Sequence, residues 1–186
     1  MWSLVVMRTR LKLALLSVLI MISVGSGVPE NVAVGPYDIS FDLNATVDYE
    51  IETLGPEYFE TKEGVSYVEH TLVLNGTDYF TFITIRRFDY PIVADNESTI
   101  YEAEAFLERI GCQDIQSYGR EIDQRAGFVA TGTNIFNTNE VYALYWLDRV
   151  TFTSEDYMAT LLCSISSDLP SDVVESLLDT IHVVMT

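Results

Sequence analysis

Alternation of apolar and polar residues is the dominant pattern along the chain, and its two-residue period predicts β-strands. It is strictest over 37–43, where every odd position is apolar, and weaker over 49–53. Segments 65–74 and 79–85 are rich in β-branched and aromatic residues and flank Asn75-Gly76, a dipeptide that favours tight hairpin turns. We therefore expect them to form one hairpin. Further apolar segments predict strands over 112–122, 126–135, 140–148 and 152–166.

A helical period replaces the alternation over 98–110. Thr99 and Glu102 have the spacing of a capping box, and Gly111 follows where a left-handed residue would end the helix. The apolar residues lie three or four apart and so share one face: Ile100, Ala103, Leu107 and Ile110. The acidic residues are then expected to face solvent: Glu102, Glu104 and Glu108.

A second helix is expected over 170–184, with Pro170 near its start and Asp172 and Glu175 placed to cap it. Its apolar face would comprise Val174, Leu177, Leu178, Ile181 and Met185. The pattern as a whole predicts an α+β fold, an antiparallel sheet of about six to eight strands with two helices packed on it. It would form a single domain over 37–186, preceded by an extended lead-in over 28–36.

The N-terminal segment 1–27 has the three parts of an export signal: basic residues, an uncharged apolar run from Leu13 to Val24, and the small residues Gly25-Ser26-Gly27. The apolar run is shorter than the roughly 20 residues that a membrane-spanning helix needs. We expect a cleaved signal peptide, the alternative being an uncleaved N-terminal anchor. Either way the domain is expected outside the cytoplasm, secreted or held at the cell envelope.

The chain is strongly acidic, with a formal net charge of −18, and every acidic residue lies at Glu30 or later. Nucleic-acid binding needs clustered basic residues, so this class of function is excluded. Lys62 is the one lysine after the signal segment. An acid-rich, lysine-poor surface stays hydrated at high ionic strength and is typical of proteins secreted by salt-tolerant archaea.

The order of elements resembles the PsbP-like family: a leading YDISFDL strand, hairpin strands, one amphipathic helix, four more strands and a closing SLLDTIHV helix. The resemblance spans about 37–184 and rests on element order, without a diagnostic motif. It implies a largely non-enzymatic protein that acts through protein contacts, and it transfers no site residues.

Catalytic residue types are scarce. His70 and His182 are the only histidines, and each is expected to have a structural role. The segment after the signal contains no nucleophile elbow and no zinc-protease motif. We therefore expect no enzymatic activity.

Cys112 and Cys163 are an even pair in an exported domain, so a disulfide is one interpretation and two buried free thiols are the other. A zinc site formed with the histidines is disfavoured, because the spacings match no ligand pattern. No cofactor is indicated, although the abundant carboxylates leave calcium open, with the acidic run Asp95-Asn96-Glu97 as the densest cluster.

Three N-glycosylation sequons begin at Asn44, Asn75 and Asn96, all in expected turns. Arg86-Arg87 is a rare basic pair that either neutralises nearby carboxylates or contacts a partner. The aromatic cluster Tyr142, Tyr145 and Trp146 is expected in the core, the alternative being an exposed sugar or protein platform.

Two functions remain open at this point. The first is a non-enzymatic interaction or assembly domain at the cell surface, with a protein of the envelope as partner. The second is a module that binds a small ligand or calcium outside the cytoplasm.

Overall fold

The computed structural model describes residues 21–24, 29–44, 47–153 and 156–186, with only the backbone described for 21–24. Of the described residues, 62% lie in strands and 16% in helices. The prediction of an α+β fold with one sheet is therefore wrong. The protein is mainly β, with two antiparallel sheets, because the strands run longer than the patterns indicate and two more strands form beside them.

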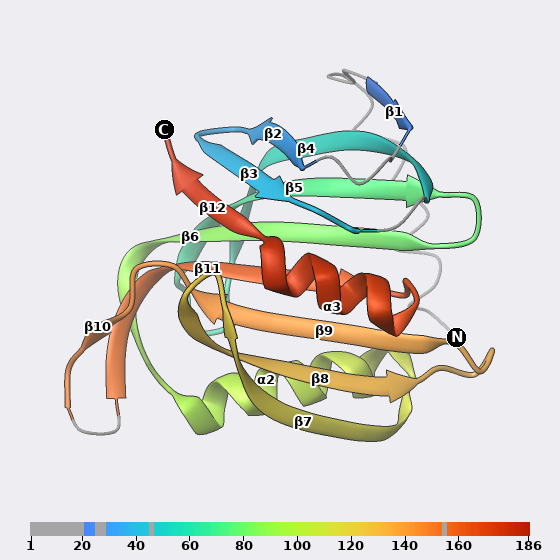
Figure 1. Ribbon diagram of the computed structural model, residues 1–186. Coiled ribbons are helices and arrows are strands. Elements are labelled where there is room, and N and C mark those ends of the chain that lie inside the picture. Colours follow the sequence, from blue (N-terminus) through green and yellow to red (C-terminus); the bar gives the residue numbers. More distant parts are fainter. Residues whose placement is uncertain (1–20, 25–28, 45–46, 154–155) are drawn as a thin grey trace.

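The large sheet has eight strands in a continuous antiparallel order. They are β1 (Met21–Val24), β4 (Asp48–Glu60), β5 (Ser66–Gly76), β6 (Phe80–Asp95), β11 (Asp156–Ser167), β9 (Asn139–Trp146), β8 (Arg125–Thr133) and β7 (Gln113–Ile122). The short strand β10 (Val150–Thr151) pairs with the start of β11, and this hairpin projects at the left in Figure 1. The expected hairpin over 65–85 is confirmed as β5 and β6.

The small sheet contains three strands in the order β12 (His182–Met185), β3 (Tyr37–Phe41) and β2 (Glu30–Val34). The extended lead-in over 28–36 thus contains a strand of the fold. Gly35, in the turn between β2 and β3, has φ +60°, and a Cβ there would lie 2.2 Å from Nδ1 of His70. A glycine lets this turn pass directly over the imidazole.

Helix α2 (Asn96–Ile110) confirms the helix predicted over 98–110, and Gly111 ends it in the left-handed conformation. The predicted capping pair is wrong, because Asp95 and Ser98 form the reciprocal cap. Asp95 lies outside the first turn with an extended backbone and accepts the Ser98 amide at 2.6 Å. An aspartate in that position satisfies an amide that the helix leaves without a partner.

Helix α3 (Ser171–Thr180) is shorter than the predicted helix over 170–184. The Ile181 amide still donates to Leu177, but the following residues are extended and pair with β3 as β12. This segment is rich in β-branched residues, which suit a strand. Met185 consequently lies exposed at the end of β12, away from any helix face.

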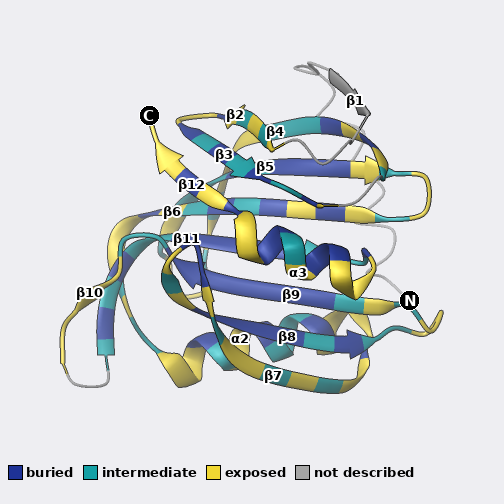
Figure 2. Ribbon diagram, in the orientation of Figure 1, coloured by how far each residue is buried: buried dark blue, intermediate teal, exposed yellow. Residues whose placement is uncertain are grey.

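The two helices lie on opposite faces of the large sheet (Figure 1). Strand β9 shows the division most clearly, since its alternate residues enter different cores. The α3-side core contains Val141, Ala143 and Tyr145 together with residues of α3 and the small sheet. The α2-side core contains Tyr142, Leu144 and Trp146 together with Ala103 and Leu107 of α2. Figure 2 shows β9 buried along most of its length, which explains why its sequence is apolar without alternation.

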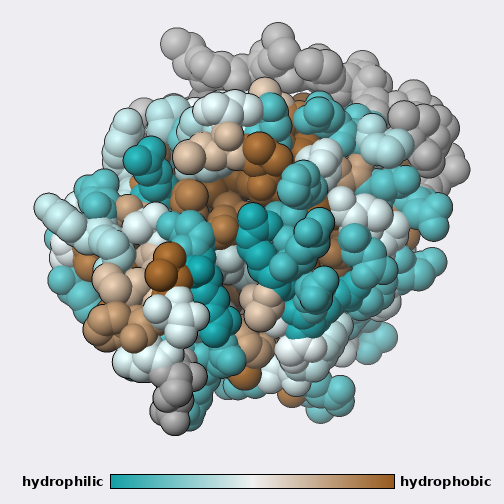
Figure 3. All heavy atoms as spheres, turned by 60° about the vertical axis from the view of Figure 1, so that its left-hand side comes forward, coloured by the Kyte–Doolittle hydropathy of each residue, from teal (hydrophilic) through white to brown (hydrophobic). Residues whose placement is uncertain are grey.

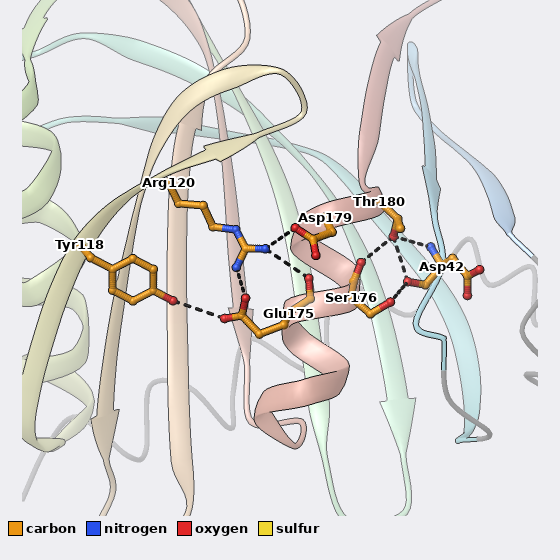
Figure 4. A network of polar contacts seen from close by, with 7 residues as sticks. All are labelled: Asp42, Tyr118, Arg120, Glu175, Ser176, Asp179 and Thr180. Carbon is orange, nitrogen blue, oxygen red and sulfur yellow. Dashed lines mark hydrogen bonds and ion pairs between the residues drawn. The ribbon is translucent and has the colours of Figure 1, made fainter.

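A network of polar contacts holds α3 against the sheets (Figure 4). Arg120 of β7 pairs with Glu175 and Asp179 on α3, and Tyr118 of β7 donates to Glu175. On the other side of the helix, Thr180 and Ser176 both donate to the Asp42 carbonyl at the end of β3. Helix α3 is thereby attached to the edge strand β7 of the large sheet and to the end of β3, the central strand of the small sheet.

The segment predicted as a signal peptide, 1–27, lies mostly outside the described residues. Its described part, β1, pairs with β4 in the register Met21 with Ile51 and Val24 with Asp48. Among the described residues, no helix has both the length and the apolar character to cross a membrane.

Candidate functional site

A pocket of about 320 Å³ opens on the α2 side of the large sheet. It lies where the first turns of α2 meet the bent end of β6, and β5, β11 and the end of β9 also contribute residues to its lining. Its walls combine aromatic, aliphatic and a few polar side chains: Thr61, Tyr67, Arg86, Phe88, Ile92, Val93, Ala94, Ser98, Thr99, Glu102, Trp146 and Leu162.

Aromatic rings form one wall of this pocket. The Tyr67 ring lies 5.3 Å from the Phe88 ring, and the Phe88 ring lies 6.1 Å from that of Trp146, centroid to centroid. Both pairs are tilted, which avoids the face-to-face stacking that the ring quadrupoles disfavour. The row continues away from the pocket, since Phe59 stacks on Tyr67 and Tyr157 meets Trp146 edge to face.

An ion triad forms the polar end. The Nε of Arg86 bonds Glu69 on the neighbouring strand at 2.6 Å, and its terminal nitrogen lies 3.4 Å from Glu102 on α2. Burial by itself would lower the pKa of Arg86, but Tyr142, Glu69 and Glu102 outweigh it and raise that pKa. The guanidinium therefore stays charged between two carboxylates.

Hydroxyl groups hold the start of α2 against the sheet beside the pocket. The Thr99 hydroxyl donates to the Asp95 carbonyl at 2.8 Å and shares a 2.7 Å hydrogen bond with Tyr157. The indole N–H of Trp146 lies 3.5 Å from the same Thr99 oxygen. The buried polar atoms at this end thus have partners, which fixes the orientation of Trp146.

The two residues of the basic pair face opposite sides of the sheet. For Arg86 the predicted neutralisation of nearby carboxylates is confirmed, because its side chain bonds Glu69 and Glu102. Arg87, the next residue along β6, is exposed on the other face. A partner contact by Arg87 stays a prediction.

The candidate disulfide between Cys112 and Cys163 is not formed, and both residues are buried free thiols. Cys112 belongs to the α2-side core and Cys163 to the α3-side core, so the large sheet separates them. Burial raises the pKa of Cys163 to about 12 and also raises that of Cys112. Both groups are therefore protonated and weak nucleophiles.

The two histidines lie apart from the pocket. His70 of β5 is buried beneath Gly35 and meets the Tyr37 ring edge to face, and burial lowers its pKa. His182 of β12 bonds the carboxylate of Asp123, which also pairs with Arg125 and accepts the Val183 amide.

A polar hollow of about 410 Å³ lies beside His182. The one hydroxyl in its described lining, that of Thr180, is bonded to the carbonyls of Asp42 and Ser176. The imidazole and carboxylate thus lie without an available nucleophile in the described lining, and their contacts tie β12 to the turn between β7 and β8.

Two residues of the acidic run at 95–97 have other partners, and calcium binding there stays a prediction. Asp95 caps α2, and Asn96 accepts a hydrogen bond from Arg149. Within the part of the chain that is described, no group of three or more histidine, cysteine or acidic side chains could hold a metal ion.

The three candidate glycosylation residues are all exposed. Asn44 precedes the undescribed pair 45–46, Asn75 is the second-to-last residue of β5 rather than a turn residue, and Asn96 begins α2. Glycan attachment at any of them stays a prediction. Tyr142, Tyr145 and Trp146 are confirmed as core residues, so they form no surface platform.

Sequence reasoning missed most of the pocket. No sequence pattern marked Glu69, Tyr67 or Phe88 as site residues, and Glu102 was expected to face solvent. The available signal was the two-residue period of β5 and β6, which places Tyr67, Glu69, Arg86 and Phe88 on one face of neighbouring strands.

Comparison with known proteins gives no relative: no family model, no curated protein and no solved structure matches the chain. The resemblance to PsbP-like proteins accordingly stays a prediction.

Proposed function

We propose that this protein is an exported, non-enzymatic binding domain that takes a small, largely apolar ligand in the pocket beside α2. The pocket itself carries this proposal. Its volume of about 320 Å³ is near the lower end of the range for ligand sites. It also has their usual composition, with apolar and aromatic walls and a few oriented polar groups at one end.

Trp146 offers a direct readout of occupancy. The chain has two tryptophans, Trp2 and Trp146, so in a Trp2→Phe variant the emission comes only from the pocket wall. A panel of small aromatic and cyclic aliphatic compounds should include some that change this emission and raise the melting temperature. Ligands that bind only the folded state stabilise it by mass action.

A filled pocket provides the test of location. Ala94→Phe places a large side chain in the lining, whereas Val150→Phe makes a similar change at an exposed strand position outside it. The first variant should lose the ligand response and the second should keep it, with circular dichroism confirming that both fold. A response that survives Ala94→Phe, or a panel without any response, would contradict the proposal.

A second candidate function is contact with a protein partner, favoured by the projecting hairpin. Tyr90, Val93, Val150 and Phe152 are exposed there, each by more than half. Figure 3 shows apolar side chains on this side of the molecule, set in largely hydrophilic surface. Asp89 is exposed next to Tyr90, so the fitting partner is an apolar protein surface with basic residues at its border.

The matching experiment compares Phe152→Ser with the control Tyr58→Ser. Tyr58 is also exposed but lies elsewhere on the sheet, in β4. Chemical crosslinking to an envelope protein should be lost in the first variant, retained in the second and weakened by salt. Equal crosslinking by both variants would remove this candidate.

A further inference from the structure

The charge at the polar end of the pocket indicates what kind of ligand it takes. One guanidinium, that of Arg86, lies between the carboxylates of Glu69 and Glu102. The triad therefore carries a net negative charge. Glu102 is its accessible member, because 48% of its side chain is exposed, against 19% for Glu69, and its contact with Arg86 is the longer of the two.

The aromatic wall of the pocket also favours a positively charged ligand. Tyr67, Phe88 and Trp146 line the pocket, and the faces of aromatic rings carry negative quadrupole density, which attracts a positive group placed over them. The same row of rings already holds one cation. The guanidinium carbon of Arg149 lies 3.7 Å from the centroid of the Tyr157 ring, which in turn meets Trp146.

An anionic ligand would face the opposite conditions. It would have to displace Glu69 or Glu102 from Arg86 to gain a positive partner, and both carboxylates would repel it. The net charge of −18 on the whole chain lowers the local concentration of anions and raises that of cations. A neutral ligand would gain binding free energy only from the burial of its apolar surface.

We infer that the pocket beside α2 binds a small organic cation, an ammonium compound with an apolar body, which pairs with Glu102 and packs on the aromatic wall. This inference rests on the proposed function and specifies its ligand class.

Three probes of similar size separate the alternatives: phenethylammonium, 2-phenylethanol and 3-phenylpropanoate. Binding is measured by Trp146 emission in the full chain carrying Trp2→Phe, and by calorimetry, in about 50 mM salt so that screening stays moderate. Phenethylammonium should bind about tenfold more tightly than the alcohol, and the carboxylate should bind most weakly. Added salt should reduce the advantage of the cation.

Glu102→Gln should weaken phenethylammonium about three- to tenfold and leave 2-phenylethanol unchanged. Glu108→Gln is the matched control, an exposed glutamate on the same helix outside the pocket, and should change neither. Unfolding midpoints establish that both variants fold, and Glu102→Asp, which keeps the charge, should retain most of the preference.

The outcomes distinguish this inference from the proposed function. If the alcohol binds as well as the cation and Glu102→Gln has no effect, the ligand class is wrong while the pocket remains a binding site. If the carboxylate binds most tightly, the charge argument is overturned. If no probe binds, the inference fails, and the compound panel then decides whether the proposed function fails as well.

Discussion

The position of α2 and α3 on opposite faces of the large sheet can be tested by a double-mutant cycle. Leu107 of α2 and Leu177 of α3 are both fully buried, one in each core. Changing each to valine removes one methylene group, which costs about 0.8 kcal/mol in transfer free energy. A small cavity and the lower helix propensity of valine bring the expected loss to about 1–1.5 kcal/mol each.

The two losses should add. Residues in separate cores share no partners, so the double variant should lose the sum of the single losses to within about 0.5 kcal/mol. The melting temperature of each single variant should fall by about 2–6 °C for a chain of this size. The total of about 2–3 kcal/mol leaves a typical domain folded, so the cycle can be completed.

Urea unfolding at constant temperature is the assay, with the m-value checked for constancy across the four proteins. Phe106 and Tyr142 provide the positive control, because their rings stack with centroids 3.9 Å apart and should show a coupling of about 0.5–1.5 kcal/mol. If Leu107 and Leu177 couple as strongly as this pair, the helices share a core and the arrangement described above is incorrect.

Three further predictions concern single groups. Burial lowers the pKa of His70, so the unfolded chain takes up a proton before the folded one as pH falls below about 6.5. Stability should therefore decline toward acid pH, and His70→Gln should reduce that slope by up to about 1.4 kcal/mol per pH unit, read from urea titrations. Cys112 and Cys163 should resist a thiol reagent in the native protein and react fully in urea, and a reductant should leave the melting temperature unchanged. Arg120→Ala should cost about 1 kcal/mol by freeing α3 from β7, and Arg120→Lys should not restore it, because lysine lacks the fork that reaches two carboxylates.

Local signals were sufficient for part of the fold. The helix over 98–110 and the glycine that ends it depend on neighbouring residues, and the sequence predicted both. The second helix was predicted too long because Ile181 and Met185 continue its apolar face and fit a strand equally well. Pairing with β3, more than 130 residues earlier in the chain, decides in favour of the strand.

The pocket could not be predicted in the same way. Glu69 and Arg86 are neighbours only because β5 and β6 pair in one register, and Glu102 joins them because α2 crosses the sheet at that point. Such contacts depend on tertiary packing, and an acidic residue on an exposed helical face gives no sign of them. The sequence left open whether Cys112 and Cys163 pair for a related reason, since cysteine number says nothing about which face of a sheet each side chain enters.

The place of the pocket follows from the dimensions of the two faces. Strands lie about 4.8 Å apart and a helix is about 10 Å wide, so one helix covers only part of an eight-stranded sheet. On one face of the large sheet, α3 and the small sheet together are wide enough to cover the strands. On the other, α2 is the only helix among the described residues, and it packs on β7, β8, β9 and the edge of β6. The start of α2 lines the pocket together with Tyr67, Phe88 and Trp146, so the pocket lies at the boundary of the surface that the helix covers. Such a boundary leaves a concave site, and its largely apolar and aromatic walls with a few polar groups at one end are those of a ligand pocket.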